Sequence, residues 1–251
     1  MTKEIIITGA AGFLGSKFSK FFADTDYKVI GIDKNEKKLK LIESENIVTI
    51  CADITNEKEV SQIHNFLKKK YNICGLINNA AIDAVPSKTS LKNLRYPSLD
   101  TWNMEINVSI IGTFLMTKYF GELMIKKKNG SIINIGSDLS FIVPNQKIYK
   151  KAYPNYIKPP TYSVIKHGLV GLTKYYASLY ANSNVRVNMI SPGPINNTQN
   201  NILRKEIKSV TPMNRLGEYK DLFSVMNLLI EDGSQFITGQ NIFIDGGRTI
   251  I

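Results

Sequence analysis

Histidine and cysteine are scarce in this sequence. The chain of 251 residues has two histidines, His64 and His167, and two cysteines, Cys51 and Cys74. With so few histidines, neither a histidine-based metal site nor a Ser-His-Asp triad is expected. The cysteines show no disulfide framework and no metal-ligand spacing. Since both stand beside apolar runs, we expect small buried side chains.

Long uninterrupted apolar runs are also missing. No run reaches the roughly 18 residues that a membrane span needs, and the stretch before Ile5 is too short for a secretory signal. The composition, 43% hydrophobic and 21% charged, is typical of a globular protein. We therefore expect a cytoplasmic protein with no membrane partner.

Basic residues outnumber acidic ones by 32 to 21, a net charge of +11. Such a balance can indicate nucleic acid or an anionic substrate. The lysines, however, are mostly scattered. The runs Lys68–Lys70 and Lys126–Lys128 stand at predicted helix ends, where they meet the negative end of the helix dipole. This pattern favours solvated helix ends over a nucleic-acid partner.

Short apolar runs alternate with amphipathic stretches along the chain. The runs predict strands at Glu4–Thr8, Tyr27–Asp33, Ile47–Ala52, Gly75–Asn78, Gly130–Gly136, Val185–Ile190 and Asn241–Ile244. The stretches predict helices at Gly12–Ala23, Asn56–Lys70, Leu99–Ile125, Thr161–Ala181 and Gly217–Glu231. Continuous apolar runs are typical of buried parallel strands. The expected fold class is α/β: one Rossmann-type domain over residues 1–251, with a doubly wound parallel sheet of about seven strands and helices on both faces.

Two polar, proline-containing stretches interrupt this alternation, Ser140–Pro160 and Pro192–Pro212. Long loops in a compact domain are usually functional or disordered. Both stretches follow predicted strands, so we expect them at the carboxyl edge of the sheet, where open α/β folds bind ligands.

Glycines stand three apart after the first strand, at Gly9, Gly12 and Gly15. Such glycines permit a tight turn, close approach of a pyrophosphate and close packing of helix on strand, while the helix N-terminus presents N–H groups to the anion. The second strand ends at Asp33, whose carboxylate can bind ribose hydroxyls and repels a 2′-phosphate. This favours NAD(H) over NADP(H), although Lys34 could soften the repulsion, so NADP(H) stays open. Asp53, after the third strand, is either an N-cap of the next helix or an adenine contact.

Tyr162 and Lys166 are four residues apart at the start of a predicted helix, which places both on one face. A phenol is a poor base near neutral pH, and a neighbouring ammonium favours its phenolate. Ser137 ends the fifth strand, where its hydroxyl either closes the strand or donates to a substrate oxygen. Asn107 stands amid apolar residues of a long helix, where it is either surface polarity or a buried amide that needs a partner.

Together these residues resemble the short-chain dehydrogenase/reductase family over nearly the whole chain. The matching motifs, in order, are the glycine turn, Asn78-Asn79-Ala80-Ala81, Asn107, Ser137, Tyr162-x-x-x-Lys166, Ser191-Pro192-Gly193 and Thr238-Gly239-Gln240…Asp245-Gly246-Gly247. The resemblance implies a hydride transfer between nicotinamide and a secondary alcohol or ketone. It also implies a homodimer or homotetramer joined through the helices at Leu99–Ile125 and Thr161–Ala181.

The resemblance assigns catalytic roles by position. It implies that Tyr162 is the general acid and base, that Lys166 lowers its pKa and holds the nicotinamide ribose, and that Ser137 orients the substrate oxygen. It implies that Asn107 holds a water joining Lys166 to solvent, and that Asn79 supports the cofactor. The other implied cofactor contacts are the glycine turn with Phe13 and Leu14, Asp33, Asp53 and Ile54 near adenine, Ala80 and Ala81, and Pro192, Gly193 and Ile195 beside nicotinamide.

Two departures from the family pattern bear on specificity. Phe13 occupies the usual second glycine position, so the pyrophosphate approach differs. Ser137 and Tyr162 are about twelve residues further apart than the family pattern predicts. This insertion, 141–160, carries Tyr149, Tyr153 and Tyr156 with Lys147, Lys150, Lys151 and Lys158. With the loop 194–216, it is expected to form the substrate side, either as a binding surface for an anionic sugar derivative or as a solvated lip.

Three functions remain open. The insertion resembles family members linked to bacterial surface-sugar and flagellin modification, which favours an enzyme acting on a sugar or nucleotide sugar. The alternatives are a 3-oxoacyl-carrier-protein or small-ketone reductase and a non-catalytic dinucleotide sensor. Since sensors commonly lose the Tyr/Lys pair, the retained residues favour an enzyme.

Overall fold

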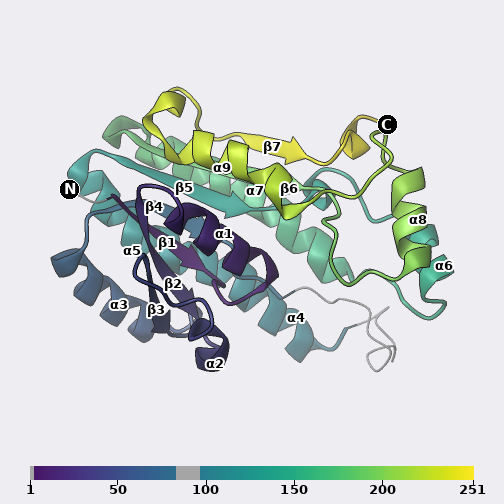
Figure 1. Cartoon of the computed structure of the whole chain (residues 1–251), viewed down its shortest axis with the longest axis horizontal. Helices are drawn as coiled ribbons and strands as arrows, with labels where there is room; N and C mark the ends of the chain where they lie inside the picture. Colours follow the sequence, from purple (N-terminus) through teal and green to yellow (C-terminus); the bar gives the residue numbers. More distant parts are fainter. Residues whose placement is uncertain (1–2, 83–96) are drawn as a thin grey trace.

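The apolar runs of the sequence form one parallel sheet in the computed structural model, which describes residues 3–82 and 97–251. The strand order is β3-β2-β1-β4-β5-β6-β7, and every neighbouring pair is parallel (Figure 1). The strands are β1 (Lys3–Thr8), β2 (Tyr27–Asp33), β3 (Ile47–Cys51), β4 (Ile73–Asn78), β5 (Gly130–Ile135), β6 (Val185–Pro192) and β7 (Asn241–Ile244). The α/β, Rossmann-type prediction with seven strands is confirmed.

Helices cover both faces of the sheet. They are α1 (Phe13–Ala23), α2 (Glu36–Leu39), α3 (Glu57–Lys70), α4 (Leu99–Ile106), α5 (Gly112–Lys127), α6 (Gln146–Ala152), α7 (Pro160–Tyr180), α8 (Asn201–Ser209) and α9 (Phe223–Ile230). On one face, α3, α5 and α7 bury residues such as Leu67, Phe120 and Tyr176 against the sheet. On the other face, α1 and α9 bury residues such as Phe18 and Met226. Because both faces are covered, the strands of the sheet centre are buried along nearly their whole length and are mostly apolar.

The two stretches expected as loops contain short helices. α6 lies within the insertion, and α8 lies within the loop after β6; Figure 1 shows them side by side at one end of the sheet. Their contact forms a small separate core of Ile148, Leu203, Ile207 and Leu216. Helical periodicity is weak over so few residues, so the sequence did not indicate either helix.

The segment Leu99–Lys127 is helical throughout, with a π-helical turn at Asn107–Ile111 between α4 and α5. Within the described residues it is the one helix long and apolar enough to cross a membrane by length and composition alone. Its apolar residues Leu115, Met116, Phe120 and Met124 are at most 4% exposed because they pack on the sheet. Packing on the sheet therefore accounts for its apolar character.

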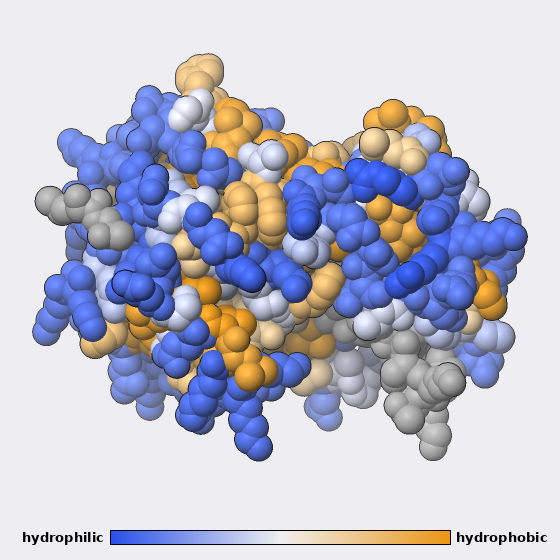
Figure 2. Space-filling model, in the orientation of Figure 1, coloured by the Kyte–Doolittle hydropathy of each residue, from blue (hydrophilic) through white to orange (hydrophobic). Residues whose placement is uncertain are grey.

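The face of the molecule in Figure 2 is mostly hydrophilic, with smaller hydrophobic areas between the hydrophilic side chains. Lys68, Lys69 and Lys70 lie in the last turn of α3, and Lys126 and Lys127 lie in the last turn of α5, as predicted. The prediction that both cysteines are buried is wrong for Cys51, which is exposed at the edge strand β3.

Candidate functional site

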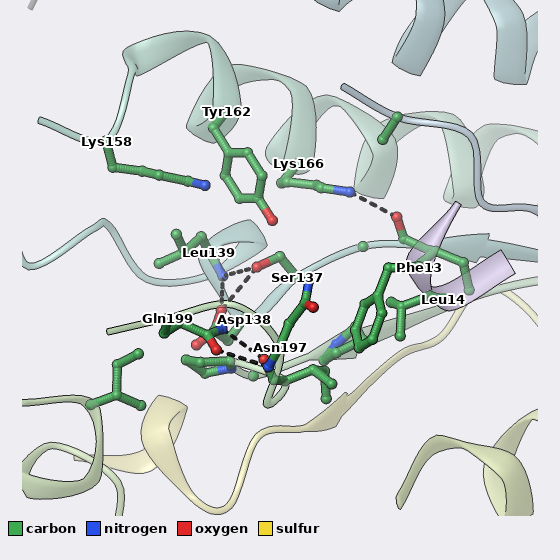
Figure 3. A pocket seen from close by; sticks show the side chains of 18 of the residues that line it. Phe13, Leu14, Ser137, Asp138, Leu139, Lys158, Tyr162, Lys166, Asn197 and Gln199 are labelled. Carbon is green, nitrogen blue, oxygen red and sulfur yellow. Dashed lines mark hydrogen bonds between the residues drawn. The ribbon is translucent and has the colours of Figure 1, made fainter. Parts of the chain in front are cut away.

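Two adjoining pockets open where the strands end at their carboxyl edge. The first, here called the β1–β4 groove, is lined by Gly9, Gly12, Phe13, Leu14, Ile32, Asp33, Lys34, Ala52, Asp53, Ile54, Asn79, Ala80, Ala81, Ile82, Val108 and Asn197. The second, here called the Tyr162 pocket, holds Ser137, Tyr162, Lys166, Pro192, Gly193 and Ile195 (Figure 3). Phe13, Leu14 and Asn79 line both, so the two pockets form one continuous site.

The glycine turn has the tight geometry that its spacing predicts. Gly9 has φ +63°, a conformation that side chains rarely adopt. A Cβ on Gly15 would lie 2.0 Å from the carbonyl oxygen of Gly9, so helix α1 packs directly on the turn. Gly12 is the N-cap of α1 and has no side chain to accept from the first-turn N–H groups. The N-terminus of α1 therefore suits an anion at the mouth of the groove.

Thr8 joins the turn to the end of β4. Its hydroxyl oxygen accepts hydrogen bonds from the backbone N–H of Asn79 and of Ala80, both at 3.1 Å. The Asn79 amide donates to the carbonyl oxygens of Thr8 and Gly9, at 3.0 and 3.2 Å. Asn79 therefore shapes the turn from inside. Thr8, which precedes the glycines, was not predicted because its partners follow β4, 71 and 72 residues further along the chain.

Asp33 and Asp53 both lie in the β1–β4 groove. Asp33 accepts from the backbone N–H of Ala11 at 3.1 Å and of Asn35 at 2.9 Å, which orients its carboxylate between the turn and the strand end. Asp53 accepts from the N–H and hydroxyl of Thr55. Its alternative reading as N-cap of α3 is wrong, because Asn56 caps that helix by accepting from Lys58.

Tyr162 and Lys166 lie on the first turns of α7, which begins at Pro160 because proline suits the first helical position. The Lys166 ammonium is 5.6 Å from the centre of the Tyr162 ring and donates to the carbonyl of Ile135 at 3.0 Å. Figure 3 shows the phenolic oxygen of Tyr162 directed toward the segment that carries Ser137. The structure thus brings together three of the four predicted catalytic residues.

Ser137 has a partner that was not predicted. Its hydroxyl donates to Asp138 Oδ1 at 2.9 Å, and its oxygen accepts from the Leu139 N–H at 3.2 Å. Asp138 also pairs with Arg248, and the two side chains are 3% and 6% exposed. Burial raises the pKa of the Asp138 carboxyl, while Arg248 and the Ser137 hydrogen bond oppose that rise. Arg248 is 110 residues from Asp138, so only the tertiary structure reveals the pair.

The insertion supplies one wall of the Tyr162 pocket. Tyr149, Tyr156 and Lys158 line the pocket, and Tyr156 is fully buried, so this part of the insertion is not a solvated lip. The Lys158 ammonium lies 3.9 Å from the centre of the Tyr162 ring, opposite Lys166 (Figure 3). Of the other residues expected there, Lys147, Lys150 and Lys151 are exposed on α6, and Tyr153 packs in the core between α6 and α8.

The Asn107 side chain agrees with the interpretation as surface polarity, and its implied catalytic role stays a prediction. Asn107 begins the π-helical turn between α4 and α5, and its side chain is exposed rather than buried in an apolar face. Asn107 is not one of the described residues that line the two pockets. The helical periodicity was interpreted as regular, but a π-helical turn contains an extra residue and rotates the side chains that follow it.

The groove fits a dinucleotide. The turn brings backbone N–H groups to the place of a pyrophosphate, Asp33 can accept from ribose hydroxyls, and Asp53 and Ile54 border the far end. Lys166 and Pro192 to Ile195 border the side that would hold the reactive ring. Gly193 is close to β7: a Cβ there would lie 2.8 Å from Asp245 Cα.

Comparisons with known proteins agree with this geometry. A family model described as "Enoyl-(Acyl carrier protein) reductase" matches residues 9–249. The chain is 34% identical, over 98% of its length, to 3-oxoacyl-[acyl-carrier-protein] reductase FabG of Buchnera aphidicola, of which it covers 97%. It is 29% identical to the protein of the same name from Thermotoga maritima, over 99% of this chain and 98% of that one.

Two solved structures are similar to this chain in both fold and sequence. A short chain dehydrogenase from Leptospira borgpetersenii with bound NAD+ has a TM-score of 0.85 and 31% identity, covering 99% of this chain and 93% of that one. The structure of ElxO with NADP bound has a TM-score of 0.85 and 27% identity, covering 100% of each chain.

Proposed function

Because the chain belongs to the short-chain dehydrogenase/reductase family and is an NAD(P)-dependent oxidoreductase acting on a CH–OH or C=O carbon, we propose that it interconverts a secondary alcohol and a ketone on a small anionic substrate. The observation that carries this proposal is the position of Tyr162, which lies between two buried ammonium groups and is directed toward Ser137.

The proton is handled by Tyr162 in this proposal. When bound, the nicotinamide supplies or accepts the hydride. The Tyr162 phenol gives a proton to the substrate oxygen in reduction and removes it in oxidation. Lys158 and Lys166 favour the phenolate, because an opposite charge nearby stabilises the ionised form. Lys166 would also hold the ribose, and a water at Asn107 would connect it to solvent.

Tyr162→Phe tests this role, because it removes the hydroxyl and keeps the ring beside both lysines. We expect turnover to fall by at least about 100-fold, the usual contribution of a general acid or base. NADH binding, measured by nicotinamide fluorescence, should be unchanged, which controls for folding. Full activity in Tyr162→Phe would exclude this mechanism.

We propose NAD(H) as the preferred cofactor because Asp33 would repel a 2′-phosphate. Lys34 lies beside it in the groove, and similar structures hold NAD+ in one case and NADP in another. Asp33→Asn keeps the shape and removes the charge. We expect it to raise kcat/KM for NADPH relative to NADH by about 10-fold or more, from a charge interaction of 1 kcal/mol or more at close range. An unchanged ratio would argue against a role of Asp33 in cofactor choice.

The Tyr162 pocket supports an anionic, polar substrate. Its described lining includes Lys158, Tyr149 and Gln199, while the charge of Arg248 is paired with Asp138. Since tyrosines and cations suit a sugar that carries phosphate or a nucleotide, we propose a phosphorylated or nucleotide-linked sugar in surface-glycan synthesis.

A 3-oxoacyl thioester is the second candidate, favoured by the names of the relatives and by the apolar residues Leu139, Leu203 and Ile207 in the same pocket. A panel of sugar phosphates, nucleotide sugars and acetoacetyl-CoA, each with NADH, NADPH and the oxidised cofactors, separates the two by kcat/KM. Lys158→Met should lower kcat/KM for the sugar phosphates and leave uncharged ketones less affected. Turnover of acetoacetyl-CoA alone would overturn the sugar proposal.

We further propose a cytoplasmic homodimer or homotetramer. Exposed apolar side chains stand on the two long helices expected at the interface: Ile111 and Phe114 before and within α5, and Val164, Tyr175 and Leu179 on α7. Light scattering behind size exclusion measures the assembly, and Phe114→Lys with Leu179→Lys should shift it to the monomer.

A further inference from the structure

A buried ion pair links the segment after β7 to the predicted catalytic serine. Arg248 pairs with one carboxylate oxygen of Asp138, and Ser137 donates to the other at 2.9 Å. The backbone N–H of Leu139 also donates to that second oxygen, at 2.9 Å. Both carboxylate oxygens are therefore engaged, one by Arg248 and one by Ser137. Arg248, Asp138 and Ser137 all line the Tyr162 pocket.

The turn after β7 positions Arg248 beside Asp138. Gly246 and Gly247 have φ of +66° and +89°, and a Cβ on either would lie within 3.1 Å of Thr211 or Pro212. Asp245 closes the turn by accepting from the N–H of Gly247 at 2.9 Å and of Thr249 at 2.8 Å. The turn packs against the loop that follows α8, where the Met213 N–H donates to the Gly246 carbonyl at 3.1 Å. The Asp-Gly-Gly motif thus places a guanidinium beside β5.

The hydrogen bond to Asp138 limits the groups to which the Ser137 hydroxyl can donate. A serine hydroxyl has one proton, so Ser137 cannot donate at once to Asp138 and to a substrate oxygen. In the arrangement seen here, its oxygen already accepts from the Leu139 N–H at 3.2 Å, which leaves one lone pair to accept from a group in the site (Figure 3). An acceptor suits the hydroxyl of an alcohol substrate or of Tyr162. Hydrogen bonds to charged groups are stronger than neutral ones, so this orientation is firmly held.

We propose that Asp138, fixed by Arg248, is a positioning residue that sets the direction of the Ser137 hydroxyl. The segment after β7 is thereby part of the active site. The inference rests on the proposed function, because it concerns how Ser137 meets the reacting oxygen. It goes beyond that function by assigning two residues that act on the reaction through Ser137.

The test is a double-mutant cycle on the full chain, with the best substrate of the panel. Arg248→Met should lower kcat/KM by about 10- to 100-fold, the contribution of a hydrogen bond to a charged group. Ser137→Ala should lower it by about 100-fold or more. If Arg248 acts through Ser137, Arg248→Met in the Ser137→Ala background should change kcat/KM by less than about twofold. Arg248→Lys, which keeps a cation, should restore part of the loss.

Arg186→Met is the matched control. Arg186 is also a buried arginine, 8% exposed, but it binds the carbonyl of Glu231 at the opposite end of β6. The Arg186→Met substitution should lower the melting temperature without lowering kcat. Melting temperature and NADH binding are measured for every variant. If Arg248→Met does not fold, Asp138→Asn, which keeps the side-chain shape, enters the same cycle.

Two results would overturn the inference. One is an equal loss from Arg248→Met with and without Ser137, which would mean that Arg248 contacts substrate or supports the fold instead. The other is full activity of Arg248→Met alone. Neither result touches the proposed function, which is tested separately by Tyr162→Phe and by the substrate panel. The two proposals can therefore fail separately.

Discussion

Gly15→Ala is the substitution whose cost the structure defines best. Its Cβ would lie 2.0 Å from the oxygen and 2.8 Å from the carbon of the Gly9 carbonyl. Carbon and oxygen normally approach no closer than about 3.3 Å. The turn or the helix would therefore have to move by roughly 1.3 Å, the difference between these two distances.

Little in the turn can give way. Gly9 is in a left-handed conformation, and its carbonyl accepts from the Asn79 amide at 3.2 Å. A side chain added to a tight site usually costs about 1–3 kcal/mol, and rigid backbone on one side places this case at the upper end. For a chain of this size, about 3 kcal/mol lowers the melting temperature by roughly 6–12 °C. NADH affinity should fall as well, because the same turn faces the pyrophosphate.

The loss of stability should decrease in the order Gly15→Ala, Gly12→Ala, Gly233→Ala. Gly12→Ala meets the Gly9 oxygen at 3.1 Å and should cost less, whereas Gly233→Ala meets nothing within 4 Å and should be neutral or slightly stabilising. Thermal unfolding by circular dichroism and fluorescence titration with NADH measure both effects. A Gly15→Ala protein that melts within about 2 °C of the unaltered chain would refute the reasoning.

Two further predictions concern ionisable groups. Arg215 and the Glu218 N–H bind the Asp221 carboxylate and hold its pKa below the usual range. The carboxylate therefore stabilises the fold above the pKa of the unfolded chain, about 3.9. This stabilisation is lost as the pH falls through the lower pKa of the folded state. Asp221→Asn should therefore cost about 1 kcal/mol at pH 7 in urea unfolding, and the gap should narrow below about pH 5; a constant gap would argue against the ion pair. Burial raises the pKa of the Cys74 thiol to about 11, whereas Cys51 is exposed. Dithionitrobenzoate at pH 8 should therefore label one thiol quickly, and Cys51→Ser should remove that fast phase.

Much of the fold could be read from local pattern. The predicted strand Tyr27–Asp33 agrees with β2 at both ends, and Asn241–Ile244 agrees with β7. Buried parallel strands are mostly apolar, so runs of apolar residues in the sequence indicate them. α6 and α8 left none, because each is short and packs mainly on the other rather than on the sheet.

The residues of the candidate site also fall into those with a local sequence pattern and those that depend on tertiary contacts. Gly9, Gly12, Gly15, Tyr162 and Lys166 were recognisable because turn geometry and the four-residue helical repeat act over short stretches. The sequence alone thus determined the class of fold, the glycine turn after β1 and the Tyr162–Lys166 face of α7. Only the tertiary structure showed that Asn107 begins a π-helical turn with its side chain exposed, that Lys158 lies on the Tyr162 ring and that Arg248 pairs with Asp138. These outcomes depend on contacts between distant segments, whose geometry follows from packing the whole chain and not from any local pattern of residues.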